Sequence, residues 1–320
     1  MSSLRKKGIE FIRIVLARVG YKLKPISSSI PIALPSFDGD PRALRYLRKN
    51  RDYLITARLK DGRSLFVFPL SDIHGHPFSG AVKSALDVSL TGGDEREAIR
   101  LGLRRFYWFH QPEFAAEVLG VAPKDIPMLG VQPPWVVIKP WEDMTVTERQ
   151  EKIIRHERKD NSHISKVDMS VEHGCNFCGP VSEEKLEVEV ERLYKIMKSI
   201  RKNGFIRHDF LDGDIRVELL VDSSGNWKWL VKSGQHRAAV ISALGFSSVP
   251  VRVGSVVCRD EVDVWPQVLA GNYSRKIALQ VFDNIFVGVG LGKGCRIGSP
   301  GVAARPWRYD AMFSSIDKDG

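Results

Sequence analysis

The sequence predicts an α+β protein that combines a strand–helix–strand domain with an additional N-terminal α+β lobe and a helical C-terminal cap. Three observations carry this prediction. Residues 227–232 alternate apolar and basic side chains, which is typical of a half-buried strand. The Ala-rich run at 237–243 favours a helix that ends at Gly245, and an apolar strand resumes at 249–253. The charged segment 148–159 is expected to form a further helix.

The composition sets limits on the architecture and on the partners. The chain has 320 residues, of which 43% are hydrophobic, so it can bury one large core or two smaller ones, and we expect two lobes. A net charge of +10 permits nucleotides, anionic lipids and nucleic acids as partners. The expected segments are a basic amphipathic helix at 1–24, an α+β lobe at 36–140, a polar connector at 141–180, the strand–helix–strand domain at 181–257, a helical cap at 258–303 and a flexible tail at 304–320.

The segment 1–24 is basic and amphipathic. On a helical wheel Leu4 and Phe11 fall on one side, whereas Lys6 and Arg13 fall on the other. Such a helix can lie on an anionic membrane surface; the alternative is a first helix packed against the protein's own core. We expect no cleavable signal and no membrane span, and four cysteines suit a reducing compartment. These features predict a cytoplasmic protein, peripheral to the inner face of the membrane where this helix binds lipid.

The lobe at 36–140 opens with a hairpin pattern. The apolar runs 53–59 and 64–68 are separated by Asp61 and Gly62, a pair that favours a tight turn between two strands. We therefore expect a two-stranded hairpin here. The helices expected further along this lobe span residues 95–109 and 113–119.

Two short motifs raise the question of a metal site. The segment 72–76 places one Asp and two His close together, but a third ligand at a defined spacing is missing, and a plain polar loop is the alternative. Cys175 and Cys178 form a Cys-x-x-Cys pair that could bind zinc or change redox state. A zinc site needs a second ligand pair, and Cys258 and Cys295 lie far apart in the sequence. We expect two ordinary cysteines and no metal site.

The turn at Gly234 is the sharpest chemical feature of the chain. A helix that begins beside it presents amide N–H groups without internal partners and the positive end of its dipole, so an anion is favoured there. Arg237 can add a bidentate contact to a phosphate, and His236 can add a donor or a proton. The alternative is an ordinary surface turn with a solvated basic pair.

The string SGQHRAAVISALGFSSVPVRV at 233–253 resembles the signature of the ParB/sulfiredoxin-like superfamily, in which a Gly-x-His-Arg turn precedes an Ala-rich helix, a Leu-Gly pair and a Val-Pro strand. Upstream, 199–205 resembles the helix end of that family and 215–221 its first strand, so the resemblance covers residues 183–257. It implies a nucleotide-binding domain that takes ATP or CTP, with Mg²⁺ as a candidate ion. The implied nucleotide-binding residues are Ser233, Gly234, Gln235, His236 and Arg237.

Two departures from the family pattern exclude branches of the superfamily. Gln235 stands where a sulfiredoxin has its reactive cysteine, so sulfinic-acid reduction is not expected. The region after Val257 has no clear pair of amphipathic helices for a DNA-reading domain, which disfavours a DNA clamp. The pattern is most similar to the small-molecule kinases of the superfamily, although Ser233 replaces their aspartate.

The resemblance therefore implies a phosphotransferase or NTPase that acts on a small metabolite or glycan precursor. Candidates for the acceptor base are His208, Asp209, Asp212 and Asp214 on the loop before the first strand, with Asp209, His208 and His236 as the expected catalytic residues. The alternatives are a non-catalytic, nucleotide-dependent scaffold at the membrane and, less favoured, a DNA-binding protein or nuclease.

Overall fold

The computed structural model describes residues 30–34, 37, 39–47, 52–72, 75–207 and 213–289, and it has the α+β character that the sequence predicts. One six-stranded mixed sheet has the order β1-β2-β6-β4-β5-β3. The pairs β1–β2, β6–β4 and β5–β3 are parallel, whereas β2–β6 and β4–β5 are antiparallel. The strands are β1 (Ile32–Leu34), β2 (Tyr53–Arg58), β3 (Gly62–Arg63), β4 (Arg216–Val221), β5 (Trp227–Ser233) and β6 (Ser248–Cys258).

Helices pack around this sheet. The α-helices are α2 (Leu44–Leu47), α3 (Pro77–Ser89), α4 (Glu95–Phe109), α5 (Ala115–Val118), α6 (Val146–Asn161), α7 (Glu183–Asn203), α8 (Gln235–Ala243), α9 (Pro266–Leu269) and α10 (Arg275–Val287). Short 3-10 helices are η2 (Pro41–Ala43), η3 (Leu59–Asp61), η4 (Pro123–Asp125), η5 (Val171–His173) and η6 (Arg259–Val264). Among the helices of the described ranges, none is both long and apolar enough to cross a bilayer.

The prediction of a hairpin at 53–68 is wrong. β2 pairs with β1 and β6, while β3 pairs with β5 at the other end of the sheet. After Gly62 and Arg63 the chain forms a turn, in which Ser64 N donates a hydrogen bond to Phe68 O at 2.8 Å. The Asp61-Gly62 pair therefore ends a short 3-10 helix instead of joining two paired strands.

The strand–helix–strand unit at 227–253 is confirmed. β5 ends at Ser233, Gly234 adopts φ +86°, and α8 starts at the next residue. The left-handed φ favours glycine, and a Cβ at this position would lie 3.1 Å from the carbonyl oxygen of Asp214. The glycine thus lets the chain leave the sheet sharply and places the start of α8 against the entry to β4.

The longer helices begin at side-chain caps that the sequence supplies. Thr145 accepts a hydrogen bond from Glu148 N at 3.2 Å, and the Glu148 carboxylate accepts one from Thr145 N, which forms a capping box at the start of α6. Ser182 caps α7 by accepting from Lys185 N at 3.1 Å. Both helices carry the residues that face the candidate site described below.

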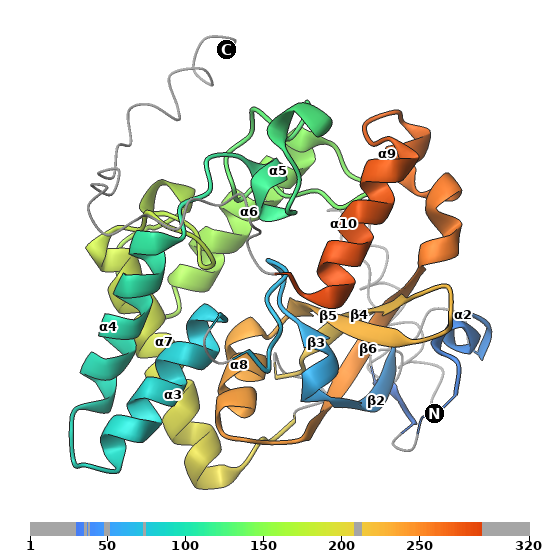
Figure 1. Ribbon diagram of the computed structural model, residues 1–320. Coiled ribbons are helices and arrows are strands. Elements are labelled where there is room, and N and C mark those ends of the chain that lie inside the picture. The colour runs from blue at the N-terminus through green and yellow to red at the C-terminus, as the bar shows by residue number, and fades with distance from the viewer. Residues whose placement is uncertain are drawn as a thin grey trace, which may run out of the picture.

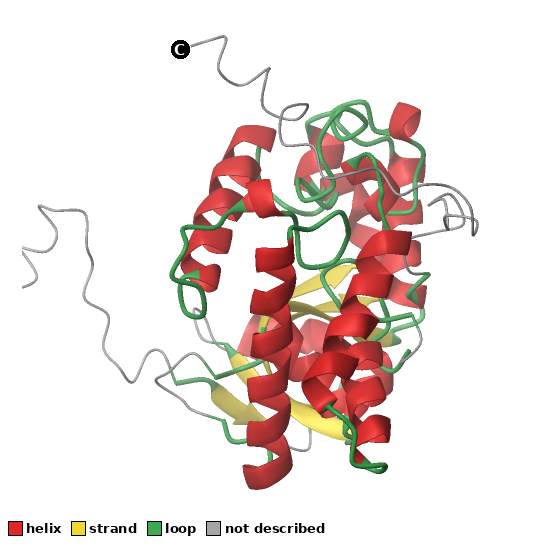
Figure 2. Ribbon diagram, turned by 90° about the vertical axis from the view of Figure 1, so that its left-hand side faces the viewer, coloured by secondary structure: helices red, strands yellow, loops and turns green. Residues whose placement is uncertain are grey.

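Helices α3, α4, α7 and α8 pack against one another and form a layer beside the sheet, to the left of it in Figure 1. Turned by 90°, the same helices stand in front of the strands (Figure 2). The apolar core is continuous through both layers, and it includes residues from the range 36–140 as well as from 181–257. Because β2 pairs with β6, these two ranges share one sheet.

Candidate functional site

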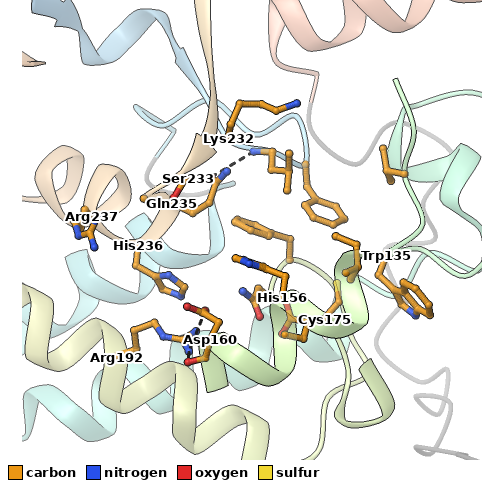
Figure 3. A pocket seen from close by; sticks show the side chains of 18 of the residues that line it. Trp135, His156, Asp160, Cys175, Arg192, Lys232, Ser233, Gln235, His236 and Arg237 are labelled. Carbon is orange, nitrogen blue, oxygen red and sulfur yellow. Dashed lines mark hydrogen bonds and ion pairs between the residues drawn. The ribbon is translucent and has the colours of Figure 1, made fainter. Parts of the chain in front are cut away.

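A cavity of about 350 Å³ lies where the start of α8 meets α6, α7 and the loops at 65–66, 135–139 and 175–177. Pockets that bind small molecules have volumes of about 300–1,000 Å³. Figure 3 shows side chains of the end of β5 and the start of α8 on one side of it and side chains of α6 on another. All five residues predicted to bind a nucleotide line this cavity: Ser233, Gly234, Gln235, His236 and Arg237.

The start of α8 places backbone N–H groups at the cavity. Ala238 N donates to the oxygen of the N-cap residue Gly234 at 2.9 Å. No side chain caps the helix. The first turn of α8 and the positive end of its dipole therefore lie at the cavity, where they favour an anion.

Gln235 fixes the wall of the cavity. Its amide Nε2 donates to Val231 O at 2.8 Å, and its Oε1 accepts from Leu65 N at 3.4 Å. The side chain thus joins the loop at Leu65 to β5. This gives Gln235 a structural role in addition to its place on the lining.

Arg237 lies at the edge of the site. Its Nη1 donates to the backbone oxygen of Asp214 at 3.4 Å, and Figure 3 places it apart from His156 and Trp135, on the other side of His236. The carboxylate of Asp214 is buried and lies 3.1 Å from Arg207 Nη1. The other acceptor-base candidates, His208, Asp209 and Asp212, lie outside the described residues.

His236 is held between two partners. Its Nε2 lies 2.6 Å from Glu189 Oε2 on α7, and its ring stacks on Phe78 with centroids 4.4 Å apart. Burial lowers the pKa of His236, although the Glu189 carboxylate acts in the opposite direction. The imidazole is therefore neutral at neutral pH, with its Nε2 proton donated to Glu189. Among the described residues Nδ1 has no hydrogen-bond partner.

Glu189 belongs to a buried ion cluster formed by Glu157, Lys185, Glu189 and Arg192. Its carboxylate lies 2.7 Å from Arg192 Nη1 and 3.0 Å from Lys185 Nζ, and Lys185 also donates to Glu157 at 2.8 Å. Burial alone would raise the pKa of Glu189, but Arg192 and then Lys185 hold it well below its usual range. The cluster fixes α6 to α7 beneath the cavity and holds Glu189 ionised against His236.

Part of the lining beside the start of α8 is basic. Lys139, Arg149 and Lys232, called here the basic group, surround the single carboxylate of Glu142, with Lys232 Nζ at 2.8 Å and Lys139 Nζ at 3.5 Å from it. Arg149 pairs with the other oxygen of Glu142, and its buried Nε has no partner in the described structure. Burial lowers the pKa of Lys139 to about 8. Three cations around one carboxylate leave excess positive charge beside the start of α8, although Glu218 lies 3.7 Å from Lys232.

The remaining wall is apolar and aromatic. The rings of Phe66 and Phe177 stack with centroids 5.0 Å apart, and both line the cavity together with Trp135. On α6, His156 and Asp160 lie one helical turn apart and also face the cavity. The site therefore presents a charged end and a flat apolar surface.

Sequence reasoning missed the basic group and the α6 side chains. Lys232 is adjacent to the predicted box, but Lys139 and Arg149 come from the segment treated as a polar connector and its flank. The one available signal was the spacing of His156 and Asp160, which puts two polar side chains on the same side of an amphipathic helix.

The described residues of the motif at 72–76 form no metal site; residues 73 and 74 lie outside the described ranges. His76 instead caps α3, since its Nδ1 accepts hydrogen bonds from Phe78 N and Ser79 N at 3.2 Å each. Cys175 and Cys178 are buried, are not joined in a disulfide, and have their sulfurs 3.0 Å apart. In the described ranges no three His, Cys, Asp or Glu side chains are placed to hold a metal ion.

Comparison with known proteins adds no relative to this picture. No protein-family model, curated protein sequence or solved structure matches the chain.

Proposed function

We propose that this protein is a nucleotide-binding enzyme of the ParB/sulfiredoxin-like class, a phosphotransferase or NTPase acting on a small metabolite or glycan precursor. One observation carries the proposal: the start of α8, which no side chain caps, and the basic group line the same cavity. Backbone N–H groups at a helix start together with Lys and Arg side chains are the usual means of holding phosphate. The cavity is large enough for one small ligand.

The charged part of the cavity suits the phosphates of ATP or CTP, and its aromatic wall suits the base. The triphosphate would lie between Gly234 and the basic group, and the base would stack against the wall formed by Phe66 and Phe177. Mg²⁺ usually reaches such sites on the phosphates and takes only one or two carboxylates from the protein. Asp160 lines the cavity with 36% of its side chain exposed, so it could supply one of them.

His236 is the residue in the described site best placed to accept a proton. Glu189 holds the proton on Nε2, which leaves the lone pair on Nδ1 for the hydroxyl of an acceptor or for water. Because its pKa is lowered by burial, the neutral form dominates at neutral pH. Asp209 and His208 remain candidates for the same step from the segment outside the described residues.

The test measures ATP and CTP binding by calorimetry for the wild type, Lys232→Gln and Lys228→Gln. Lys232 belongs to the basic group, whereas Lys228 lies on the same strand, pairs with Asp61 at 2.5 Å and does not line the cavity. Losing one charged contact to phosphate should weaken binding about tenfold or more. The proposal fails if the wild type binds neither nucleotide, or if both variants bind as the wild type does.

A turnover assay on the same samples separates the alternatives. Phosphate release or transfer that is lost in His236→Gln supports the enzyme. Binding without turnover instead supports the non-catalytic scaffold, whose membrane contact through residues 1–24 lies outside the described structure and can be tested by deleting them and measuring binding to anionic vesicles. Salt-sensitive DNA binding would favour the DNA-binding reading.

A further inference from the structure

The Cys-x-x-Cys pair has the geometry of a dithiol that can close. Cys175 and Cys178 face each other across an isolated antiparallel bridge, and their sulfurs lie 3.0 Å apart. Residues opposed in an antiparallel bridge have Cα atoms about 4.5–5.5 Å apart, which is within the span of a disulfide. A disulfide bond of about 2.05 Å therefore requires the sulfurs to approach by only about 1 Å.

The surrounding core keeps the pair in this position. Tyr107 Oη donates to the backbone oxygen of Asn176 at 2.9 Å, and Gly179 N donates to His110 O at 2.7 Å. Phe177, between the two cysteines, packs against Phe78 with ring centroids 4.9 Å apart. The loop is thus tied to α4 and to the apolar core on both sides of the pair, so the sulfurs do not depend on a mobile backbone to meet.

Only one of the two cysteines lines the cavity. Cys175 is 6% exposed and lines it, next to Asn176 and Phe177. Cys178 is 3% exposed and is not part of the lining. A reagent must therefore come through the cavity and meet Cys175 first. The hydrogen bond from Cys178 lowers the pKa of the Cys175 thiol despite its burial, which favours the thiolate, the form that attacks.

We infer that Cys175 and Cys178 form a dithiol–disulfide couple that exchanges with low-molecular-weight, anionic disulfides entering the cavity. The Cys175 thiolate attacks one sulfur of the incoming disulfide, a mixed disulfide forms, and the first small thiolate leaves and takes up a proton. The Cys178 thiol then loses its proton and attacks the Cys175 sulfur, which releases the second small thiol. The protein loses two electrons and two protons, and the small disulfide is reduced to two thiols.

The preference for an anionic disulfide comes from the basic group, which lines the same cavity as Cys175. The lining carries five cationic side chains, Lys139, Arg149, Arg192, Lys232 and Arg237, against the acids Glu157 and Asp160. With Glu142 and Glu218 beside the basic group also counted, the excess charge is still positive, so a carboxylate-bearing disulfide is attracted and a cationic one is repelled. This inference needs only the cavity, the two thiols and the basic group. It does not depend on nucleotide binding.

The test exposes the reduced full-length protein to oxidised glutathione, an anionic disulfide, and in parallel to cystamine, a cationic one. Remaining thiols are alkylated at intervals, and each cysteine is followed by peptide mass spectrometry. In the wild type, 175 and 178 should lose their thiols together and form an internal disulfide, while Cys258, whose pKa is raised by burial, reacts more slowly. Added salt should slow the reaction with glutathione and speed that with cystamine.

Two variants locate the attacking sulfur. Cys178→Ser should stop at one glutathione attached to Cys175, and Cys175→Ser should leave Cys178 unreacted, whereas Cys258→Ser should behave as the wild type. The inference is overturned if the wild-type thiols at 175 and 178 stay fully alkylatable after Cys258 has reacted, or if Cys178 is modified as fast as Cys175. The peptide mass spectrometry of the wild type tests the inference even where a variant does not fold.

Discussion

His236 on α8 and Glu189 on α7 are 47 positions apart in sequence, and their Nε2 and Oε2 atoms lie 2.6 Å from each other. The glutamate carboxylate is fully buried and is paired at the same time with Lys185 and Arg192. The histidine in the turn of the candidate site is therefore oriented by an ion cluster that also joins two helices. Stability and function are linked at this contact.

Replacing Glu189 with Gln should destabilise the fold by about 3 kcal/mol, because the change removes one of the two carboxylates that pair with each of the buried cations Lys185 and Arg192. Glu187→Gln is the matched control on the same helix. The Glu187 side chain is 38% exposed and pairs with Arg100 at the surface, so its loss should cost less than about 1 kcal/mol. Urea unfolding of both variants checks this, and equal losses would contradict a special role for Glu189.

Lys139→Met should make the protein more stable at neutral pH while weakening anion binding. The folded pKa of Lys139 is about 8 against 10.5 in the unfolded chain, so holding this lysine charged inside the fold costs up to about 3 kcal/mol below pH 8. Between pH 8 and 10.5 the wild type gains stability, because only its unfolded chain is still protonated there. The advantage of the variant should shrink over that window in urea unfolding, and a variant less stable than the wild type at pH 7 would refute the argument.

His76→Asn should reduce the loss of stability in acid. Burial lowers the pKa of His76 to about 3, so from pH 6.5 down to 3 the unfolded chain binds a proton that the folded chain excludes. Stability then falls by up to about 1.4 kcal/mol per pH unit from this group. Asn can still cap α3 but does not titrate. Between pH 6.5 and 4.5 the wild type should lose about 2 kcal/mol more than the variant, as measured by chemical denaturation; parallel losses would show that another group dominates.

Gly234→Ala should damage the site more than Gly245→Ala. Both glycines have φ above +80°, so both substitutions carry a backbone cost of about 1–2 kcal/mol. A Cβ at 234 would also lie 3.2 Å from Ile215 Cα, whereas nothing lies within 4 Å of one at 245. The first variant should therefore be less stable and bind nucleotide more weakly, and the second should keep its affinity. Thermal unfolding and calorimetry on the pair decide the point.

The local pattern was sufficient to predict the elements whose pairing is close in sequence. The strand, glycine turn and helix at 227–243 follow from alternation, a left-handed residue and helix propensity, all of which act over a few residues. α4 has the bounds that the sequence indicates, Glu95–Phe109. Here the side-chain pattern and the tertiary packing favour the same structure.

Prediction failed where a distant partner decides the outcome. The residues of β2 form a strand as expected, but they pair with β6 instead of with the nearby run at 64–68. The basic group likewise depends on three segments that meet only in the folded chain. Lys139 and Glu142 are only three positions apart, but Lys232 on β5 contacts the same carboxylate from 90 positions away, and no local pattern indicates that contact.

The pairing of β2 with β6 has a consequence for how the chain is made. Tyr53 pairs with Val253, so one partner of the interior strand β2 is synthesised two hundred residues after it. Until β6 leaves the ribosome, the edge of β2 that faces it exposes unpaired backbone groups to other nascent chains. Closure of the sheet is thus a late, long-range event, and a chain cut short before Ser248 would be prone to aggregate instead of folding to a smaller stable unit.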